Sequence, residues 1–290
     1  MSVVTRFAPS PTGWLHLGHA YAALFAHEEA RKSGGRFLIR MEDIDQTRVR
    51  PEYEAAIFED LTWLGIEWEQ PVRKQSEHFD DYRAALEKLS SLGLIYPCFC
   101  TRKEIQDEIT RAGQAPHGPD GPLYPGTCRN RSASEQQERI ATGQPYALRL
   151  DIAKAVASIG RDLYWDDLDR GHQKAEPAAF GDVVLARKET PTSYHLAVVV
   201  DDALQDITLV TRGEDLFEAT HLHRLLQELL RLPVPQWRHH RLITDETGKR
   251  LAKRDDARSL RALRAEGWSA LQIRKTLGFP DQPDPCRRDG

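Results

Sequence analysis

Hydrophobic and polar residues along the first 95 positions predict a strand, a helix, a second strand and two further helices. A short β-favouring run covers 3–7, apolar residues recur at helical spacing over 17–30, and 37–39 is again an apolar β-favouring run. A loop containing proline and glycine separates the first strand from the first helix. This strand–helix–strand order is the unit of a parallel, doubly wound sheet. Two amphipathic helices are predicted at 51–64 and 77–93.

The pattern loosens after residue 95 and becomes regular again near residue 182. Residues 113–126 are rich in glycine and proline and are predicted to form a loop. We predict strands at 183–185, 195–200 and 207–210 and a helix at 216–230. The simplest interpretation is one sheet whose chain is interrupted by an insertion.

We therefore expect an α/β protein built on a Rossmann-type, doubly wound parallel sheet. The main domain would comprise 1–95 and 182–240, and the insertion would be 96–181. A basic loop and a short helical segment are expected within 241–281. The last residues, 282–290, are rich in proline, aspartate and arginine and are predicted to be disordered.

The composition is that of a globular chain without a membrane segment. Of 290 residues, 40% are hydrophobic and 29% are charged, and no run of 18 apolar residues occurs. The first residues lack the pattern of a signal peptide, so we expect a cytoplasmic protein. We also expect a monomer. Because the net charge is −4, any binding of nucleic acid must use a local basic patch.

Four cysteines, at positions 98, 100, 128 and 286, indicate a metal site rather than a disulfide scaffold. Cys98 and Cys100 are too close in sequence for an ordinary mutual disulfide. Three thiolates in a loop-rich segment fit a structural Zn²⁺ site, which prefers four ligands. His117 or Cys286 would be an ordinary fourth ligand. The alternative is three thiols that bind no metal.

Two histidines, His16 and His19, stand at the predicted start of the first helix. A helix N-terminus offers N–H groups and a partial positive charge, which suit a phosphate. Gly18 between them would let a nucleotide approach the backbone closely. The alternative is that both are ordinary surface histidines.

The residues around this pair resemble a known family. His16-Leu17-Gly18-His19 resembles the HIGH signature of class I aminoacyl-tRNA synthetases, and the preceding segment 6–13 resembles their glutamyl branch. Segments 192–202 and 210–216 are similar to the same family. Residues 250–254 stand where the family has its KMSKS loop, but arginine replaces the first lysine and both serines are absent.

The resemblance implies an ATP site and a glutamate site. For ATP, which acts with Mg²⁺, it implies His16, Gly18, His19 and Lys253, of which the two histidines and the lysine would be catalytic. For glutamate, it implies Arg6, Phe7, Ala8, Pro9, Ser10, Glu42, Tyr194 and Arg212. The arginines would bind carboxylates and Glu42 the ammonium group. The alternative for Arg6, Arg212 and Glu42 is that they form ordinary ion pairs.

The resemblance also bears on the cysteines. Related chains fill a zinc site with the pattern Cys-x-Cys and then Tyr-x-x-x-Cys, which here selects Cys98, Cys100, Tyr124 and Cys128. A phenol is a weak ligand at its normal pKa, so His117 and Cys286 stay open as alternatives. The metal would brace the insertion, because a filled tetrahedral site has no open position for chemistry.

The length of the chain after the KMSKS-like loop suggests a subfamily. A glutamyl-tRNA synthetase of ordinary design continues into a helical anticodon-binding domain, whereas this sequence ends soon after Arg254. It therefore resembles the glutamyl-Q tRNA(Asp) synthetases, which implies ATP, L-glutamate and tRNA-Asp carrying queuosine as partners. The alternatives are an enzyme that charges a tRNA 3′ end, glutamate activation for a non-RNA acceptor, and a non-enzymatic RNA-binding or regulatory protein.

Overall fold

The computed structural model describes residues 2–111, 117–243 and 258–279. The chain divides into two compact units, which are described separately. The first unit comprises Met1–Glu77, Ile207–Asp215 and Trp237–Gly290, and the second comprises His78–Asp206 and Leu216–Gln236. Within the described ranges, no helix combines the length and apolar character that crossing a bilayer requires.

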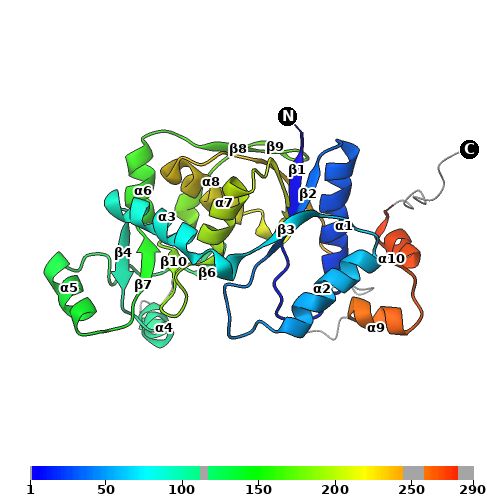
Figure 1. The fold of residues 1–290 in the computed structure, drawn as a ribbon. Helices are drawn as coiled ribbons and strands as arrows, with labels where there is room; N and C mark the ends of the chain where they lie inside the picture. The colour runs from blue at the N-terminus through cyan, green and yellow to red at the C-terminus, as the bar shows by residue number, and fades with distance from the viewer. Residues whose placement is uncertain (1, 112–116, 244–257, 280–290) are drawn as a thin grey trace, which may run out of the picture. The chain divides into compact units, whose positions relative to one another are not determined.

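The first unit contains a parallel three-stranded sheet with the order β1-β2-β3. Figure 1 shows this sheet with helices α1 and α2. The elements of the unit are β1 (Val4–Phe7), α1 (Leu17–Lys32), β2 (Arg36–Met41), α2 (Pro51–Trp63), β3 (Glu69–Lys74), η1 (Gln75–Glu77), β11 (Leu209–Gly213), η3 (Glu214–Leu216), β12 (Gln236–His240), α9 (Leu260–Ala265) and α10 (Ala270–Leu277). The predicted strand–helix–strand opening and the helix at 51–64 are confirmed.

Strand β11 lies beside β1 in this unit. Thr208 donates its backbone N–H to Val4 O at 3.0 Å, and Val4 donates its own to Thr208 Oγ1 at 2.8 Å. All four residues of β1 are buried, as expected of a strand covered on both faces. The carboxyl ends of such strands are where α/β folds bind ligands.

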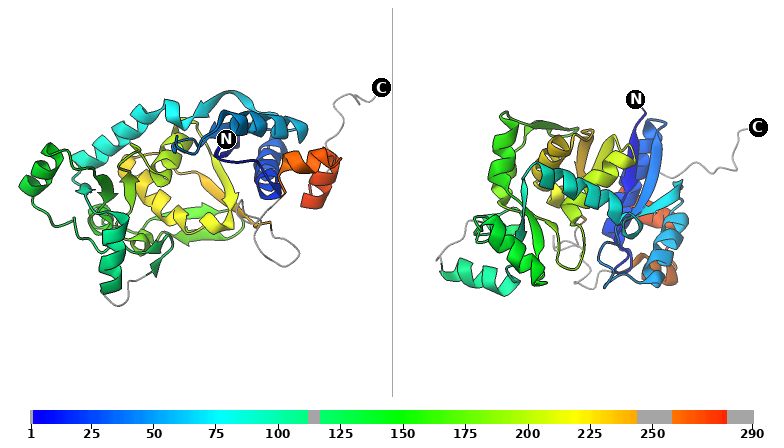
Figure 2. Two further views of the ribbon diagram at one scale, coloured as in Figure 1. Left: turned by 90° about the horizontal axis from the view of Figure 1, so that it is seen from below. Right: turned by 60° about the vertical axis from the view of Figure 1, so that its left-hand side comes forward.

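The short C-terminal helices pack on the first two helices of the same unit. Figure 2 shows α9 and α10 in orange and red next to the blue α1 and α2, in agreement with contacts of α10 with α1 and of α9 with α2. A buried ion pair, Arg274 Nη2 to Glu28 Oε1 at 2.9 Å, links α10 to α1. The helical segment predicted after the KMSKS-like loop is thereby confirmed as two helices.

The second unit contains an antiparallel sheet with the order β10-β7-β4. Its elements are α3 (Phe79–Ser91), β4 (Ile95–Cys98), α4 (Arg102–Arg111), β5 (His117–Gly118), β6 (Gly121–Pro122), α5 (Ala133–Ala141), β7 (Ala147–Leu150), α6 (Ile152–Ile159), β8 (Tyr164–Asp167), β9 (Gly171–Lys174), η2 (Pro177–Phe180), β10 (Val184–Ala186), α7 (Tyr194–Leu204) and α8 (Ala219–Leu230). Helices α3, α7 and α8 pack together, and Tyr82 donates its hydroxyl to the buried carboxylate of Asp201.

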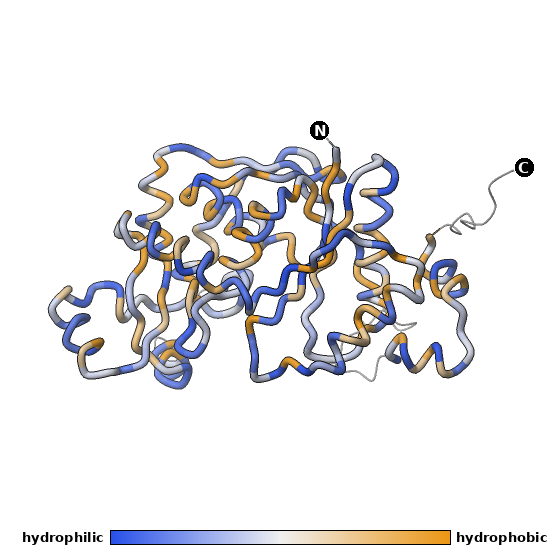
Figure 3. Tube along the Cα trace, in the orientation of Figure 1, coloured by the Kyte–Doolittle hydropathy of each residue, from blue (hydrophilic) through white to orange (hydrophobic). Residues whose placement is uncertain are grey.

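The surface helices of the second unit differ from its interior. In Figure 3, α4 and α5 are mostly hydrophilic, whereas much of α7 is hydrophobic. No residue of α5 is buried, but Leu196 to Val200 in α7 are all buried. An amphipathic or polar helix lies at a surface, and a helix that is apolar on all sides is enclosed.

Two predictions about the second half of the chain are wrong. Residues 195–200 form part of helix α7, not a strand, because an unbroken apolar run looks the same in a buried helix and a buried strand. Strand β10, which overlaps the predicted strand 183–185, pairs antiparallel with β7 instead of resuming the parallel sheet. The predicted domain bounds differ from those of the two units and stay a prediction, and the expected disorder of 282–290 lies outside the described residues.

Candidate active site and metal centre

The two histidines cap the start of α1 reciprocally. His16 is the N-cap residue, and its Nδ1 accepts the backbone N–H of Gly18 at 3.1 Å. His19 Nδ1 in turn accepts the backbone N–H of His16 at 3.2 Å, and the two ring centroids are 3.8 Å apart. Because both Nδ1 atoms accept, the proton of each neutral ring is on Nε2, which makes Nε2–H a donor for a ligand.

Gly18 allows the imidazole of His16 to lie over the first turn. A Cβ atom at Gly18 would be 3.0 Å from His16 Cε1 and 3.1 Å from His16 Nδ1, which is tighter than an ordinary contact. The sequence suggested that glycine here makes room for a nucleotide. The structure adds a nearer reason, because the glycine makes room for the histidine ring.

Two buried arginines lie on the neighbouring strands β1 and β11. Arg6 is 5% exposed and donates Nη1–H to Thr211 O at 3.0 Å, and Arg212 is 7% exposed. Arg212 donates Nε–H to Nε2 of the buried His239, on β12, at 3.2 Å. Each of these hydrogen bonds uses one of the five N–H groups of a guanidinium. A guanidinium can bind a carboxylate through two parallel hydrogen bonds. The structure thus brings the two predicted carboxylate-binding residues together.

Glu42 directly follows β2 and is held from two sides. Its backbone N–H donates to Pro9 O at 2.9 Å, which ties it to the loop that follows β1. Its Oε1 accepts Nη2–H of Arg40 at 3.2 Å, and the Arg40 side chain is fully buried. The alternative that Glu42 forms an ion pair is therefore realised, although a carboxylate has several acceptor positions and can bind an ammonium group as well.

The remaining predicted residues have different locations. Phe7 ends β1, and Ala8, Pro9 and Ser10 form the loop between β1 and α1. Tyr194 belongs to the second unit, where it begins α7. Lys253 lies outside the described residues, as does the whole KMSKS-like loop.

The side chains that the sequence did not reveal are Arg40 and His239. Each contacts a predicted site residue, Glu42 and Arg212 respectively. Arg40 gave a weak signal, since it directly follows the predicted apolar strand 37–39, and an arginine that is buried there needs a partner. His239 gave none, because its partner is distant in sequence.

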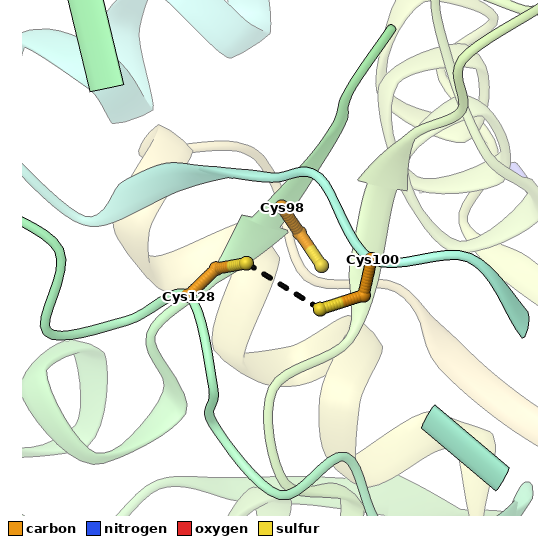
Figure 4. A group of neighbouring side chains, drawn as sticks. All are labelled: Cys98, Cys100 and Cys128. Atoms are coloured by element: carbon orange, nitrogen blue, oxygen red, sulfur yellow. Dashed lines mark hydrogen bonds between the residues drawn. The ribbon is translucent and has the colours of Figure 1, made fainter. Parts of the chain in front are cut away.

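Three cysteines gather in the second unit, as Figure 4 shows. The Sγ atoms of Cys98, Cys100 and Cys128 all lie within 4.8 Å of one another, and Cys100 and Cys128 are 3.5 Å apart. The hydroxyl oxygen of Tyr124 is 3.4 Å from Cys98 Sγ and 3.6 Å from Cys100 Sγ. A tetrahedral zinc ion with bonds of about 2.3 Å holds sulfur atoms about 3.8 Å apart, so these four side chains fit the metal.

Burial and hydrogen bonds together shift the pKa values of this cluster. Burial raises the pKa of Cys100 to about 11 and, together with hydrogen bonds to the cysteines, raises the pKa of Tyr124. Burial opposes ionisation of Cys128 as well, but a hydrogen bond from Arg131 lowers the pKa of that thiol to about 7. His117 does not belong to the group of metal-ligating side chains found among the described residues, and Cys286 lies outside them.

Comparison with known proteins defines the class of the protein. The family described as "tRNA synthetases class I (E and Q), catalytic domain" matches residues 2–278. Curated relatives identify a narrower family within this class. A glutamyl-Q tRNA(Asp) synthetase of Rhodobacter capsulatus is 51% identical over 96% of this chain and 100% of its own length. Another glutamyl-Q tRNA(Asp) synthetase, from Symbiobacterium thermophilum, is 40% identical over 97% of this chain and 88% of its own length. The chain belongs to the glutamyl-Q tRNA(Asp) synthetases of this class.

Longer relatives match over part of their length. A glutamate–tRNA ligase of Aquifex aeolicus is 42% identical over 92% of this chain, but the match covers 54% of the ligase. A crystal structure of a glutamate tRNA ligase from Elizabethkingia meningosepticum, in complex with its amino acid, has a TM-score of 0.74 and 30% identity, and the match covers 88% of this chain and 52% of that structure. A crystal structure of the glutamate–tRNA synthetase of Elizabethkingia anophelis also has a TM-score of 0.74, at 28% identity. That match covers 100% of this chain and 57% of that structure. The chain thus spans just over half the length of these structures.

Proposed function

We propose that the protein activates L-glutamate with ATP and transfers the glutamyl group to the queuosine base in the anticodon of tRNA-Asp. The main support is that one compact unit contains buried Arg6 and Arg212 on neighbouring strands and a histidine-capped helix start. An acidic amino acid needs cations for its carboxylates, and ATP needs donors for its phosphates. The names of the relatives supply the particular acceptor.

Arg6 and Arg212 would bind the carboxylates of glutamate, and Glu42 would accept hydrogen bonds from its ammonium group. Ser10 and Tyr194 would add hydrogen bonds through their hydroxyl groups. The loop residues Phe7, Ala8 and Pro9 would form the wall between β1 and α1.

In the first step a carboxylate oxygen of glutamate attacks the α-phosphorus of ATP. The bond to the β-phosphate breaks, and glutamyl-adenylate and pyrophosphate form. The Nε2–H groups of His16 and His19 would donate to phosphate oxygens at the positive end of α1, whose first turn has no acidic residue. Lys253 would neutralise charge on the leaving pyrophosphate, and ATP enters as its Mg²⁺ complex.

In the second step an acceptor hydroxyl takes the glutamyl group. Its oxygen bonds to the carbonyl carbon, AMP leaves with the electron pair of the broken bond, and the hydroxyl proton is released. Queuosine has a cyclopentenediol whose hydroxyl groups suit this step. The higher identity with the Rhodobacter glutamyl-Q tRNA(Asp) synthetase, 51% against 42% with the Aquifex ligase, favours this acceptor over a tRNA 3′ end.

Cys98, Cys100, Cys128 and Tyr124 would hold one structural Zn²⁺ ion. The backbone N–H of Cys128 donates to the Tyr124 oxygen at 2.9 Å, which favours the phenolate form that a metal ligand requires. The ion would supply four bonds that brace β4 and the segment after β6. No step of the reaction needs it.

Labelled glutamate, ATP and Mg²⁺ test this function with two tRNA pools, one containing queuosine and one lacking it. Label on the queuosine pool alone is the expected result. Equal labelling of both pools would refute the acceptor and support charging of a 3′ end. Pyrophosphate exchange without labelling would point to a non-RNA acceptor, and the absence of exchange to a protein without the activity.

A further inference from the structure

A pocket of about 280 Å³ lies entirely within the second unit. Its size is near the lower end for sites that hold small molecules. Its walls include Asp120 from the hairpin β5–β6, Arg149 from β7 and Phe180 from η2. Tyr194 and His195, at the start of α7, also line it. Among the predicted site residues, Tyr124 and Tyr194 line this pocket, and no function has been assigned to the other wall residues.

Asp120, one of the wall residues, is held in place by two histidines in series. His195 Nε2 is 3.0 Å from Asp120 Oδ2, and His195 Nδ1 is 3.1 Å from Nε2 of the buried His223. Both ring nitrogens of His195 are therefore engaged, which fits a positioning residue rather than a base. Among the described residues, Asp120 Oδ1 accepts no hydrogen bond, and the Asp120 side chain is 56% exposed.

Two further wall residues have polar atoms without partners. Ser193 is 4% exposed, and its hydroxyl oxygen is buried without a hydrogen bond. Arg149 donates Nη1–H to Asp182 O at 2.7 Å, whereas its buried Nε has no partner. Because both atoms are closed off from solvent, they do not define a ligand, and an accessible polar group of the wall is the Asp120 carboxylate.

The wall contains two arginines, Arg149 and Arg187, and two aspartates, Asp120 and Asp182, so its net charge favours neither an anion nor a cation. The oriented carboxylate of Asp120 can accept hydrogen bonds from hydroxyl groups of a neutral ligand. Carboxylates bind sugar hydroxyls in this way in dinucleotide-binding folds. Phe180 and Tyr194 provide aromatic surface against which a small carbon ring can pack.

We propose that this pocket binds a cis-vicinal diol on a five-membered ring and that Asp120, positioned by His195, accepts the hydrogen bonds of the two hydroxyls. This inference rests on the proposed function, since it assigns the acceptor subsite. Two acceptors carry such a diol: the cyclopentene ring of queuosine and the terminal ribose of a tRNA. Tyr194, a proposed glutamate contact, is a wall of the same pocket, so a bound diol lies beside it.

Asp120→Ala tests the proposal, and Asp166→Ala is its matched control. Asp166 is also 56% exposed and also contacts a histidine, His172, at 2.7 Å, but it lies outside the pocket. We expect Asp120→Ala to raise the KM for the acceptor about 10- to 100-fold, as loss of a hydrogen bond to a charged group does. Pyrophosphate exchange and the behaviour of Asp166→Ala should match the unaltered protein.

Two acceptors distinguish the sources of the diol. One is queuosine-containing tRNA-Asp trimmed of its terminal adenosine, and the other is tRNA lacking queuosine with an intact 3′ end. A raised KM in the first confirms both the subsite and the proposed acceptor. Transfer only to the second, with a raised KM, supports the subsite but refutes queuosine as the acceptor. An unchanged KM in every acceptor that is used overturns the subsite, whichever acceptor that is.

The geometry of the diol gives an independent measurement. We expect cis-1,2-cyclopentanediol to inhibit transfer by the unaltered protein, and the trans isomer to have no effect. Inhibition by the cis isomer should disappear in Asp120→Ala. Equal inhibition by both isomers, or inhibition that survives in the variant, would contradict the proposal.

Discussion

The role of His16 can be divided into a structural part and a chemical part. As the N-cap of α1, its Nδ1 satisfies the backbone N–H of Gly18, and its Nε2–H is proposed to donate to ATP. Asparagine is among the best N-cap residues, so His16→Asn should keep the cap. Its remaining N–H groups are on a shorter side chain and should not reach the position of His16 Nε2. Alanine should remove both the cap and the donor.

The expected magnitudes separate these two variants. Loss of an N-cap costs about 1 kcal/mol, which lowers Tm by about 2–4 °C in a domain of ordinary size. Loss of a donor to the transition state lowers a rate about 10²- to 10³-fold. We therefore expect His16→Asn to keep its Tm while pyrophosphate exchange falls by that factor. His16→Ala should show the same loss of rate together with the lower Tm.

The measurements are calorimetry and glutamate-dependent pyrophosphate exchange on the same preparations. Ser269→Ala provides the control, because Ser269 caps α10 of the same unit with its side chain and has no proposed contact with ATP. It should lower Tm by a similar amount and leave exchange unchanged. If His16→Asn exchanged at the rate of the unaltered protein, His16 would be a cap only, and the proposed ATP contact would be refuted.

Four further perturbations follow from the geometry. Gly18→Ala should reduce exchange about tenfold, because the new Cβ displaces the His16 ring, and unaltered exchange would show that the ring position does not matter. Arg212→Lys should raise the KM for glutamate about 10- to 100-fold, since an ammonium group cannot bind a carboxylate bidentately, and an unchanged KM would remove Arg212 from the site. Cys100→Ser should lower the zinc content measured by mass spectrometry well below one ion per chain, and full retention would disprove the ligand set. Burial raises the pKa of Asp60 from 3.8 to about 6, so the folded state loses stability as pH rises between these values. Asp60→Asn should therefore raise Tm at pH 8 but not at pH 4. Equal effects on Tm at both pH values would contradict this.

The first unit could be predicted in detail because its signals are local. The periodicity over 17–30 and the Gly34-Gly35 stop define α1, and the apolar runs at 3–7 and 37–39 define the strands on either side. The histidine pair falls at the start of that helix, which is where the structure finds it capping. Each of these features depends on residues within a few positions of one another.

Features that depend on distant residues could not be predicted from the sequence. The contact of Arg212 with His239 joins two strands separated by a helix, and no pattern in either strand indicates it. The apolar run in α7 lacks a period, so its length and composition suited a strand equally well. The position of Asp120 against His195 depends on how the β5–β6 hairpin folds back, which turn residues alone do not determine.

The choice of capping residues supports a chemical role for His16 independently of any relative. Five other described helices have a side-chain N-cap, and in each the cap is serine, threonine or aspartate: Thr101, Ser132, Asp151, Ser259 and Ser269. These residues stabilise a helix start well, so a histidine at the start of α1 offers no advantage in stability. Its advantage is a second nitrogen. When Nδ1 accepts the backbone N–H, Nε2 carries a proton that it can donate to a ligand, so capping and donation use two different atoms. A carboxylate cap has no proton to donate, and a hydroxyl cap accepts and donates through one oxygen. The helix start can therefore remain capped while His16 Nε2 donates to the phosphate proposed to bind there.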